Sequence, residues 1–503
     1  MRCVLSGLPR QSPGSCINMD VLRTAWSLAI ALVCVAAAPC YTKEGFTEAF
    51  TPAEFRARRE IVMEQIGEGV AVIHGSSEWS GFRTFRQNAQ FFYLTGVEVP
   101  RALLIIDGKA RAATLFLPAA PPPRNSRYAV DPFTLYADDS TKQLTGIENV
   151  RDREAVMGVL TDLAKQHRQF YAPFRSESRT SGAPELSRNF DRANATDPLD
   201  GRLSREAMLV TRLNTLAGAP TLDLDPIVDR LRLIKSPAEI AAMREAARIS
   251  QLAIMEVMRS ARPGVYEYQL AAAAEYEFRY HHAAGAGYFP VIGTGTNAYY
   301  GHYHYGQSQL GPSELVLIDY GPDYQNYLAD LTRMFPSNGK FTRRQREMYV
   351  AYLHLYKALE ASVKPGLTPR VILQNAAASM RRILDESRIA DPKIKAATEE
   401  FVARLPVAAF PGHGIGLEIH DPATPYGDRD DLALDRVLEP GMVLTIEPIM
   451  TIPDEKIFLR LEDELLVTDH GCESLSTLAP IEPESIERLM QERGIAERHD
   501  AGR

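Results

Sequence analysis

Apolar and polar positions follow two different periods in the first half of the chain. Residues 52–66 (PAEFRARREIVMEQI) have helical spacing, and the apolar run GVAVIHG at 69–75 is typical of a buried strand. Two further apolar runs within 102–118 flank Asp107 and Gly108, which predicts a tight hairpin. Helices and strands therefore alternate up to about residue 225, as in an α/β domain.

A second region begins after the turn-rich segment TLAGAPTLDLDP at 215–226. A strong helix signal follows at 234–258, with Ser236 as the N-cap, Pro237 at the first helical position and Glu239 completing a capping box. Further helices are predicted at 265–280, 342–362 and 369–386, and strands at 315–319, 327–335, 442–447 and 457–468. We therefore predict domains over 50–225 and 230–490, preceded by a separate region over 1–40.

Composition narrows the class of protein. The chain has 503 residues, a formal net charge of −8 and 24% charged residues. That length fits two or three domains at roughly 150 residues each, and the acidic balance argues against a nucleic-acid partner. Four cysteines lie within the first 40 residues and only Cys472 follows, so the chain is not a disulfide scaffold.

The N-terminal region has the layout of a secretory signal peptide. Arg23 precedes the apolar run WSLAIALVCVAAA at 26–38, which is shorter than the roughly 20 residues of a membrane span. Met19 is an alternative start, and Cys40 is a less favoured lipid-attachment site because Pro39 precedes it. We expect a secreted or periplasmic protein with no stable membrane span after processing. An uncleaved anchor or an apolar N-terminal helix of the fold are the alternatives.

Acidic residues end apolar strands in two predicted hairpins. In LVLIDYGPDYQNYLADLTRMF at 315–335, a hairpin centred on Tyr324 and Gln325 would place Asp319 opposite Asp330. Directly opposed side chains have Cβ atoms about 5 Å apart, so two ionised carboxylates there need a compensating charge.

The second hairpin, MVLTIEPIMTIPDEKIFLRLEDELLVT at 442–468, shows the same arrangement. Symmetry about its Pro-Asp-Glu-Lys turn places Glu447 opposite Glu462, and strand alternation puts Arg460 on the face of Glu462. A β-bulge would shift either register.

Histidines lie close to glycines in FPGHGIGLEIHD at 410–421, where His413 is flanked by glycines and His420 follows. Four carboxylates and one imidazole form a hard donor set that suits two divalent cations such as Mn, Co, Zn or Mg. Each acid taken alone could instead be a solvated strand residue, which is the alternative interpretation.

The chain resembles the metallopeptidases of the pita-bread fold (family M24), in the Xaa-Pro aminopeptidase (aminopeptidase P) and prolidase branch. The matching motifs are HYHYGQSQL at 302–310, LIDYGPDYQNYLADLTRMFP at 317–336, GHGIGLEIHD at 412–421, LEPGMVLTIEP at 438–448 and LRLEDELLVT at 459–468. FRQNAQFFYLTGVEVP at 85–100 is similar to the N-terminal domain of this branch. The resemblance implies an α+β fold, in which a C-terminal pita-bread (creatinase/aminopeptidase) domain follows an α/β creatinase-like domain.

The resemblance also implies a set of site residues. The five metal ligands would be Asp319, Asp330, His413, Glu447 and Glu462. Asp330 and Glu462 would bridge two divalent ions, most simply manganese, with cobalt or zinc as alternatives. The hydroxide between the two metals would attack the peptide bond.

Catalytic roles would fall on His302, His420, Glu447 and Arg460. Glu447 would relay a proton to the leaving amine, and the two histidines would donate hydrogen bonds to the substrate carbonyl. Arg460 would orient the acids and balance their charge, and His304 is the alternative to His302.

The chain departs from the family pattern at two positions. Ala409 stands where most relatives carry a histidine, four residues before the ligand histidine, and Thr451 stands where relatives commonly have tyrosine. Both positions are expected on the substrate side, so they leave substrate preference open. FPGHGIG with IEPIM is also similar to methionine aminopeptidases, but the RLED motif and the N-terminal domain argue against that assignment.

We therefore predict an enzyme that releases the N-terminal residue of peptides with proline in second position. A prolidase restricted to Xaa-Pro dipeptides is the nearest alternative, and a catalytically silent pita-bread binding module is the second. The resemblance implies peptide substrates as partners and a homo-oligomer, either a dimer or a tetramer.

Overall fold

The computed structural model describes residues 45–77, 85–119, 134–177, 183–421 and 435–495. They belong to one compact unit that runs from Glu44 to Arg503. The predicted signal peptide at 26–38, and most of the proline-rich segment after residue 118, lie outside the described residues. Among the helices that the structure describes, none has the length and apolar character needed to cross a membrane.

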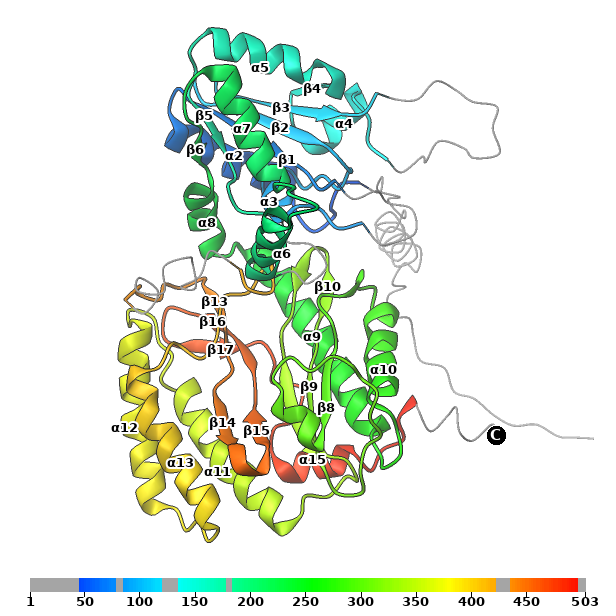
Figure 1. Cartoon of the computed structure of the whole chain (residues 1–503), viewed down its shortest axis with the longest axis vertical. Helices are drawn as coiled ribbons and strands as arrows, with labels where there is room; N and C mark the ends of the chain where they lie inside the picture. Colours follow the sequence, from blue (N-terminus) through cyan, green and yellow to red (C-terminus); the bar gives the residue numbers. More distant parts are fainter. Residues whose placement is uncertain (1–44, 78–84, 120–133, 178–182, 422–434, 496–503) are drawn as a thin grey trace, which may run out of the picture. The chain divides into compact units, whose positions relative to one another are not determined.

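The N-terminal part is built on a six-stranded mixed sheet with strand order β4-β3-β2-β1-β5-β6. Its strands are β1 (Val70–His74), β2 (Leu103–Asp107), β3 (Ala112–Leu117), β4 (Asn149–Asp152), β5 (Phe170–Ala172) and β6 (Leu222–Asp223). Its helices are α2 (Pro52–Ile66), α3 (Ala89–Thr95), α4 (Asp139–Thr145), α5 (Val156–Lys165), α6 (Pro184–Thr196) and α7 (Arg205–Ala217), with a 3-10 turn η1 (Arg153–Ala155). Figure 1 shows this sheet with its helices around it.

Both faces of this sheet are buried, which explains the unbroken apolar run of β1. Val70 and Val72 point into an apolar cluster with Leu160 of α5, whereas Ala71 and Ile73 point into the cluster on the other face, with residues of α2. A strand covered on both sides reads as continuously apolar rather than alternating. The sequence-based expectation of an α/β arrangement therefore agrees with the structure.

The hairpin between β2 and β3 turns later than predicted. Asp107 pairs with Ala112, so Asp107 and Gly108 are not the two turn residues. The Asp107 carboxylate instead accepts the backbone N–H of Ala110 at 3.0 Å and forms an ion pair with Arg168. These contacts favour the longer turn.

The C-terminal part contains several small sheets, including β12-β9-β8, β13-β16-β17, β11-β10-β7 and the pair β14-β15. Its strands are β7 (Gly285–Ala286), β8 (Val291–Thr294), β9 (Leu315–Asp319), β10 (Pro322–Tyr324), β11 (Tyr327–Leu328), β12 (Thr332–Pro336), β13 (Val443–Ile446), β14 (Ile449–Ile452), β15 (Ile457–Arg460), β16 (Asp463–Val467) and β17 (Cys472–Ser474). Its helices are α8 (Asp225–Leu233), α9 (Pro237–Ser260), α10 (Glu267–Tyr280), α11 (Arg343–Glu360), α12 (Pro369–Glu386), α13 (Pro392–Arg404) and α15 (Pro483–Leu489), with 3-10 turns η2 (Gly295–Tyr299), η3 (Leu405–Val407) and η4 (Pro453–Glu455).

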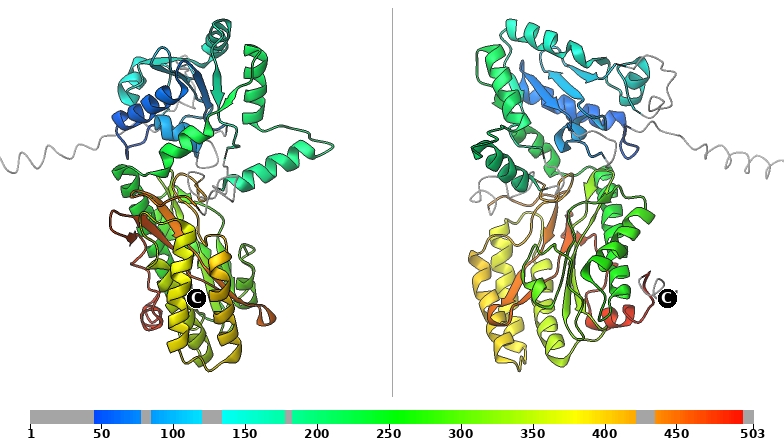
Figure 2. Two further views of the ribbon diagram at one scale, coloured as in Figure 1. Left: turned by 90° about the vertical axis from the view of Figure 1, so that its left-hand side faces the viewer. Right: turned by 45° about the vertical axis from the view of Figure 1, so that its right-hand side comes forward.

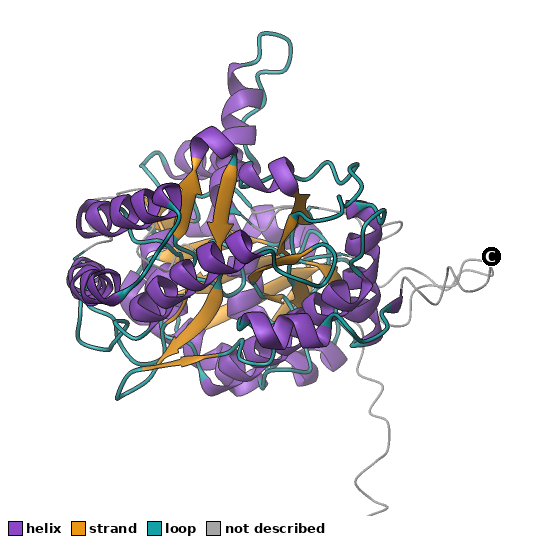
Figure 3. Ribbon diagram, turned by 90° about the horizontal axis from the view of Figure 1, so that it is seen from below, coloured by secondary structure: helices purple, strands orange, loops and turns teal. Residues whose placement is uncertain are grey.

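Helices cover these strands from two sides. In Figure 1, α10 packs against β8 and α9 against β10 and β11, whereas α13 packs against β14 and against its neighbours α11 and α12. Figure 3 shows the same enclosure of strands by helices from below. The predicted capping box at α9 is confirmed, since Ser236 accepts the Glu239 N–H and Glu239 accepts the Ser236 N–H. Helix α13 was not predicted from the sequence.

Two of the predicted long strands are broken at their acidic residues. The run 327–335 divides into β11 and β12 on either side of Asp330, and the run 457–468 divides into β15 and β16 around Glu462. At each break the backbone changes partner: the Asp330 N–H is bonded to the Glu464 side chain, and the Glu462 N–H to the carbonyl of Thr332. The breaks place both carboxylates where different sheets meet.

Candidate metal centre and active site

One large cavity is lined by every residue that was assigned a metal-binding or catalytic role from the sequence, and by Ala409, but Thr451 is not among its lining residues. Its volume is about 1520 Å³, and it is lined by residues of both the N-terminal and the C-terminal part. The assigned residues in its wall are Asp319, Asp330, His413, Glu447, Glu462, His302, His420 and Arg460, together with Ala409. Segments far apart in the sequence therefore converge on one space.

The first hairpin has a different register from the one predicted. Asp319 at the end of β9 pairs with Thr332, not with Asp330, because the turn is centred on Gln325 and Asn326. Both turn residues have positive φ, the left-handed conformation that a two-residue hairpin turn requires. Asp330 is two residues from Thr332 and so remains on the same face as Asp319.

Tyr288 joins the two aspartates of this hairpin. Its hydroxyl lies 2.7 Å from Asp319 Oδ1 and 2.7 Å from Asp330 Oδ1, and it can donate to one carboxylate at a time. Burial, and then the charges of the two aspartates, raise the pKa of Tyr288 well above its ordinary value. The phenol is therefore a neutral donor between two acids.

The second hairpin has the predicted register. Ile446 pairs with Asp463, and Ile449 pairs with Arg460. The same register places Glu447 opposite Glu462. Thr332 forms a bridge to Glu462, and its hydroxyl donates to Glu462 Oε2 at 2.8 Å. Thr332 thus stands between Asp319 on one strand and Glu462 on the next.

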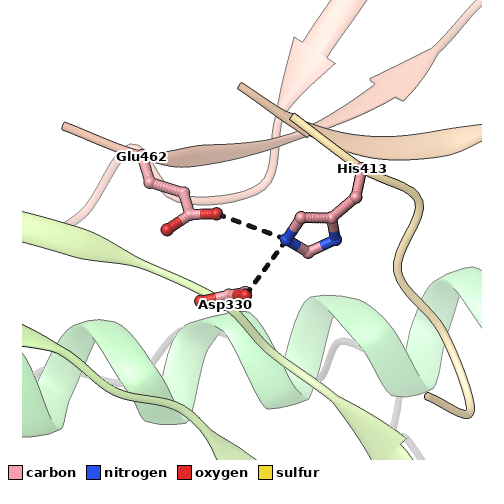
Figure 4. A group of neighbouring side chains, drawn as sticks. All are labelled: Asp330, His413 and Glu462. Atoms are coloured by element: carbon pink, nitrogen blue, oxygen red, sulfur yellow. Dashed lines mark ion pairs between the residues drawn. The ribbon is translucent and has the colours of Figure 1, made fainter. Parts of the chain in front are cut away.

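His413 faces this acid cluster. Its Nε2 lies 3.4 Å from Asp330 Oδ2, 3.7 Å from Glu447 Oε1 and 3.8 Å from Glu462 Oε1. Nδ1 lies 2.9 Å from the carbonyl oxygen of Gly414, which can only accept, so Nδ1 carries the proton and Nε2 is the nitrogen with a lone pair that could bind a metal. Figure 4 shows this ring pointing between Asp330 and Glu462.

The glycines near His413 allow close packing of this segment. A Cβ on Gly412 would lie 2.0 Å from the backbone oxygen of Thr445 on β13, and a Cβ on Gly416 would lie 2.3 Å from Asp421 Oδ2. The glycines therefore let the His413 segment lie against β13, where the Thr445 N–H donates to the His413 carbonyl at 2.7 Å.

The donor set fits divalent cations. Asp330, His413 and Glu462 each offer a ligand atom within 4.8 Å of the others, and all three are buried. Glu462 Oε1 is buried without a hydrogen-bond partner. Burial and the neighbouring carboxylates raise the pKa of Asp330 and of Glu462 well above their ordinary values. Buried carboxylate oxygens and one imidazole are ligands that a hard divalent cation prefers. A bound cation would also give the unpartnered Glu462 oxygen a partner.

Arg460 supplies positive charge from the protein itself. Its Nη2 forms an ion pair with Asp319 Oδ2, and its Nη1 lies 3.3 Å from Glu447 Oε2. Burial opposes the charged form of Arg460, but Asp319 and Glu447 together raise its pKa above the ordinary value. The predicted role of Arg460, to orient the acids and offset their charge, agrees with these contacts.

The two substrate-side histidines lie at the cavity but differ in their surroundings. The His420 ring centroid lies 4.2 Å from that of His413, and its Nδ1 is hydrogen-bonded to Glu185 of α6. His302 and His304 are both exposed, but His302 lines the cavity and His304 does not, and His304 Nδ1 lies 3.0 Å from the His302 carbonyl oxygen. This geometry favours His302 over His304 as the histidine that faces a substrate.

Several residues of the site were missed by the sequence analysis: Tyr288, Thr332, Glu464 and Glu185. Glu464 Oε1 accepts the Asp330 N–H at 2.7 Å, and its position within the LEDE stretch was the available signal. Tyr288 lies outside the motifs that identified the ligands.

Known families match both parts of the chain. Residues 241–469 match "Metallopeptidase family M24", and residues 55–171 match "Aminopeptidase P, N-terminal domain". The Xaa-Pro aminopeptidase of Escherichia coli is 30% identical over 87% of this chain and 97% of its own length. The chain belongs to metallopeptidase family M24.

Other relatives are named either Xaa-Pro aminopeptidase or intermediate cleaving peptidase. Xaa-Pro aminopeptidase 3 of Homo sapiens is 28% identical over 81% of this chain and 77% of its own length. Intermediate cleaving peptidase 55 of Arabidopsis thaliana is 27% identical over 87% of this chain and 82% of its own length.

Solved structures share the fold over nearly their whole length. Aminopeptidase P of E. coli with the inhibitor Pro-Leu superposes with a TM-score of 0.68 at 27% identity, covering 88% of this chain and 98% of that chain. Proline aminopeptidase P II of Yersinia pestis gives a TM-score of 0.68 at 28% identity, covering 88% and 100%. These comparisons confirm the predicted fold class and a metallopeptidase of the aminopeptidase P type.

Proposed function

We propose that this M24 chain is a dinuclear metal aminopeptidase that releases the N-terminal residue from peptides with proline in second position. The observation that carries the proposal is the convergence of all five assigned ligands on one cavity, with the ligating nitrogen of His413 directed at the carboxylates. The names of the relatives support the substrate class.

The proposed ligand arrangement is the one that the family resemblance implies, and it is supported by the closeness of His413 Nε2 to Asp330 at 3.4 Å and to Glu462 at 3.8 Å. Asp330 and Glu462 would help to hold both cations. Asp319 would serve one cation, and His413 with Glu447 would serve the other. Manganese is the proposed metal, with cobalt or zinc as alternatives. When bound, two such cations supply an activated water near neutral pH for attack on the peptide carbonyl.

The chain's own groups would then hold the substrate and move protons. Glu447, the least buried of the four carboxylates, is placed to pass a proton to the leaving amine. His302 and His420 would donate hydrogen bonds to the carbonyl oxygen of the scissile bond as charge develops on it. Arg460 would hold Asp319 and Glu447 in place throughout.

The cavity has room for a peptide. Its volume of about 1520 Å³ exceeds the roughly 300–1,000 Å³ of an ordinary small-molecule site. Apolar side chains such as Leu405, Phe410 and Phe458 line its wall. The names of the relatives favour the aminopeptidase over the prolidase.

A peptide panel with metal-stripped protein tests the proposal. We expect manganese to restore hydrolysis of Xaa-Pro-Xaa tripeptides and longer peptides, with cobalt and zinc assayed in parallel. Matched peptides with alanine in place of proline are the control, because one relative is an intermediate cleaving peptidase. Activity on Xaa-Pro dipeptides alone would favour the prolidase. No hydrolysis with any metal would favour a silent binding module.

We also propose that the protein is exported and self-associates, as the N-terminal run and the family resemblance suggest. N-terminal sequencing of protein purified with a C-terminal tag would locate a cleavage site. Light scattering after size-exclusion chromatography would distinguish a dimer, a tetramer and a monomer.

A further inference from the structure

A carboxylate from the N-terminal part reaches the proposed active site. Glu185, in the first turn of α6, accepts a hydrogen bond from His420 Nδ1, although the two residues are 235 positions apart. Both side chains are only partly buried, with 38% of Glu185 and 37% of His420 exposed. Glu185 lines the same cavity as the metal ligands.

The backbone around His420 is anchored independently of this contact. Glu418 and Asp421, which flank His420, form ion pairs with the buried Arg232 of α8 at 2.8 Å and 3.3 Å. Anchoring the backbone does not fix the imidazole ring, which still rotates about its side-chain torsions. Among the described residues, the His413 ring packs against the His420 ring, and the hydrogen bond from Nδ1 to Glu185 distinguishes the two ring nitrogens.

Glu185 is suited to accept this hydrogen bond as a carboxylate. Burial acts to raise the pKa of Glu185, but the hydrogen bond and charge of His420 outweigh it and hold the pKa below its ordinary value. With Nδ1–H directed at Glu185, Nε2 is the ring nitrogen that remains to meet a substrate. It accepts a hydrogen bond in the neutral ring, and it donates one to a carbonyl oxygen when both ring nitrogens carry protons.

We propose that Glu185 is a positioning residue for His420: it holds the Nδ1–H and so presents Nε2 to the peptide in the cavity. The inference rests on the proposed function, because the substrate-side role of His420 belongs to it. A carboxylate behind a histidine orients the ring in metal centres and in hydrolases alike.

The consequence is that α6 completes the site from the N-terminal part. Pro184 and Ser187 are the buried residues of this helix, and Figure 2 shows α6 extending outward beyond its first turn. The end of α6 that carries Glu185 is therefore the end that the rest of the chain holds.

A double-mutant cycle on the metal-loaded enzyme tests the proposal. We expect Glu185→Gln to lower kcat for an Xaa-Pro-Xaa peptide by roughly 10–100-fold with little change in KM, as loss of an outer orienting partner does. In a His420→Ala background the same change should cost less than about 2-fold, because the residue on which Glu185 acts is absent. Asp191→Asn, on the same helix, is the matched control and should keep wild-type activity.

A second readout does not depend on activity. The ¹⁵N shifts of the His420 ring, assigned by comparison with His420→Ala, should show a protonated Nδ1 in wild type and a mixture of tautomers in Glu185→Gln. Equal losses of kcat in both backgrounds, or an unchanged spectrum, would overturn the proposal. A rise in KM that persists without His420 would mean that Glu185 binds substrate directly, which also contradicts it. If wild type cleaves no proline peptide but the spectra differ as expected, the proposed function fails while the positioning contact stands.

Discussion

Asp330 is the residue on which the contacts of the site converge. Its two carboxylate oxygens meet Tyr288 and His413, and its backbone N–H is held by Glu464. Glu464 is buried, and burial raises its pKa well above the ordinary value. Glu464 thus holds the backbone of Asp330, whereas Tyr288 and His413 hold its side chain.

Asp330→Asn should abolish activity and metal binding together. An amide has one oxygen and no charge, so it cannot bridge two cations or balance them. The loss of kcat/KM should exceed the roughly 10–100-fold that removal of an outer partner costs. Activity on an Xaa-Pro-Xaa peptide and metal content by mass spectrometry are the measurements. Asp469→Asn, at an exposed position, is the control. Retained activity would refute the dinuclear proposal.

Tyr288→Phe should weaken the centre without removing a ligand. The ring still packs, but Asp319 and Asp330 lose their shared hydroxyl donor at 2.7 Å. We expect metal affinity or kcat to fall by roughly 10-fold or more, with unchanged circular dichroism. Titration of metal into stripped protein would show the change, and wild-type affinity would contradict the role assigned to Tyr288.

The sequence was enough to nominate candidate metal ligands, but it did not indicate the residues that hold them in place. Asp319, Asp330, His413, Glu447 and Glu462 lie in motifs whose composition suggests their chemistry. Tyr288 and Glu185 lie outside these motifs, and only the tertiary fold brings them to the site. Their roles depend on distances between segments, which a single sequence does not contain.

At the scale of elements, the two acidic hairpins show what turn chemistry can and cannot predict. The second register was predicted because its Pro453 to Lys456 turn is compact and symmetric. The first register was wrong by two residues, because Gln325 and Asn326, not Tyr324 and Gln325, adopt the left-handed conformation. The tolerance of asparagine for that conformation was the signal that should have shifted the centre.

Gly412→Ala should destabilise the protein. The added methyl would lie 2.0 Å from the Thr445 backbone oxygen, so the His413 segment must move away from β13. We expect a cost of about 1–3 kcal/mol in the free energy of unfolding, as for overpacked sites. Urea unfolding would measure it. Gly158→Ala on α5, where a Cβ meets nothing within 4 Å, is the control and should be neutral or stabilising. Equal stability of the two variants would contradict the prediction.

Glu98→Gln should change how stability depends on pH. Burial raises the pKa of Glu98 from 4.5 to about 7, opposed by a hydrogen bond with Asn326 and reinforced by Asp323. Such a carboxyl binds a proton more tightly when folded, so its stabilising effect is complete below pH 4.5 and is lost as pH rises through 7. Glutamine mimics the protonated form. The variant should therefore melt above wild type at pH 8 and near it at pH 5, and a constant difference would contradict the assignment.

At the scale of the whole molecule, folding brings negative charge together. The chain carries a net charge of −8, and the four carboxylates assigned as metal ligands line one cavity with Arg460. An ion pair between Arg86 and Asp323 at 2.6 Å connects the N-terminal and C-terminal parts. Stability and metal content should therefore be linked.

Metal removal should lower the melting temperature. Cations that bind only the folded chain stabilise it by about 2.7 kcal/mol at 100 times Kd. Calorimetry with manganese and with a chelator should show a lower Tm after chelation in wild type and no shift in Asp330→Asn. A Tm that does not respond to chelation in wild type would argue against the assigned ligands.

The order of the assigned ligands along the chain determines when the proposed metal site can form during synthesis. The assigned ligands begin at Asp319, and the last, Glu462, comes near the end of the 503 residues. A ribosome must therefore have made almost the whole polypeptide before the bridge from Thr332 to Glu462 can form. A partly synthesised chain lacks the complete ligand set. The proposed peptidase would thus become active only after almost the whole chain has been synthesised.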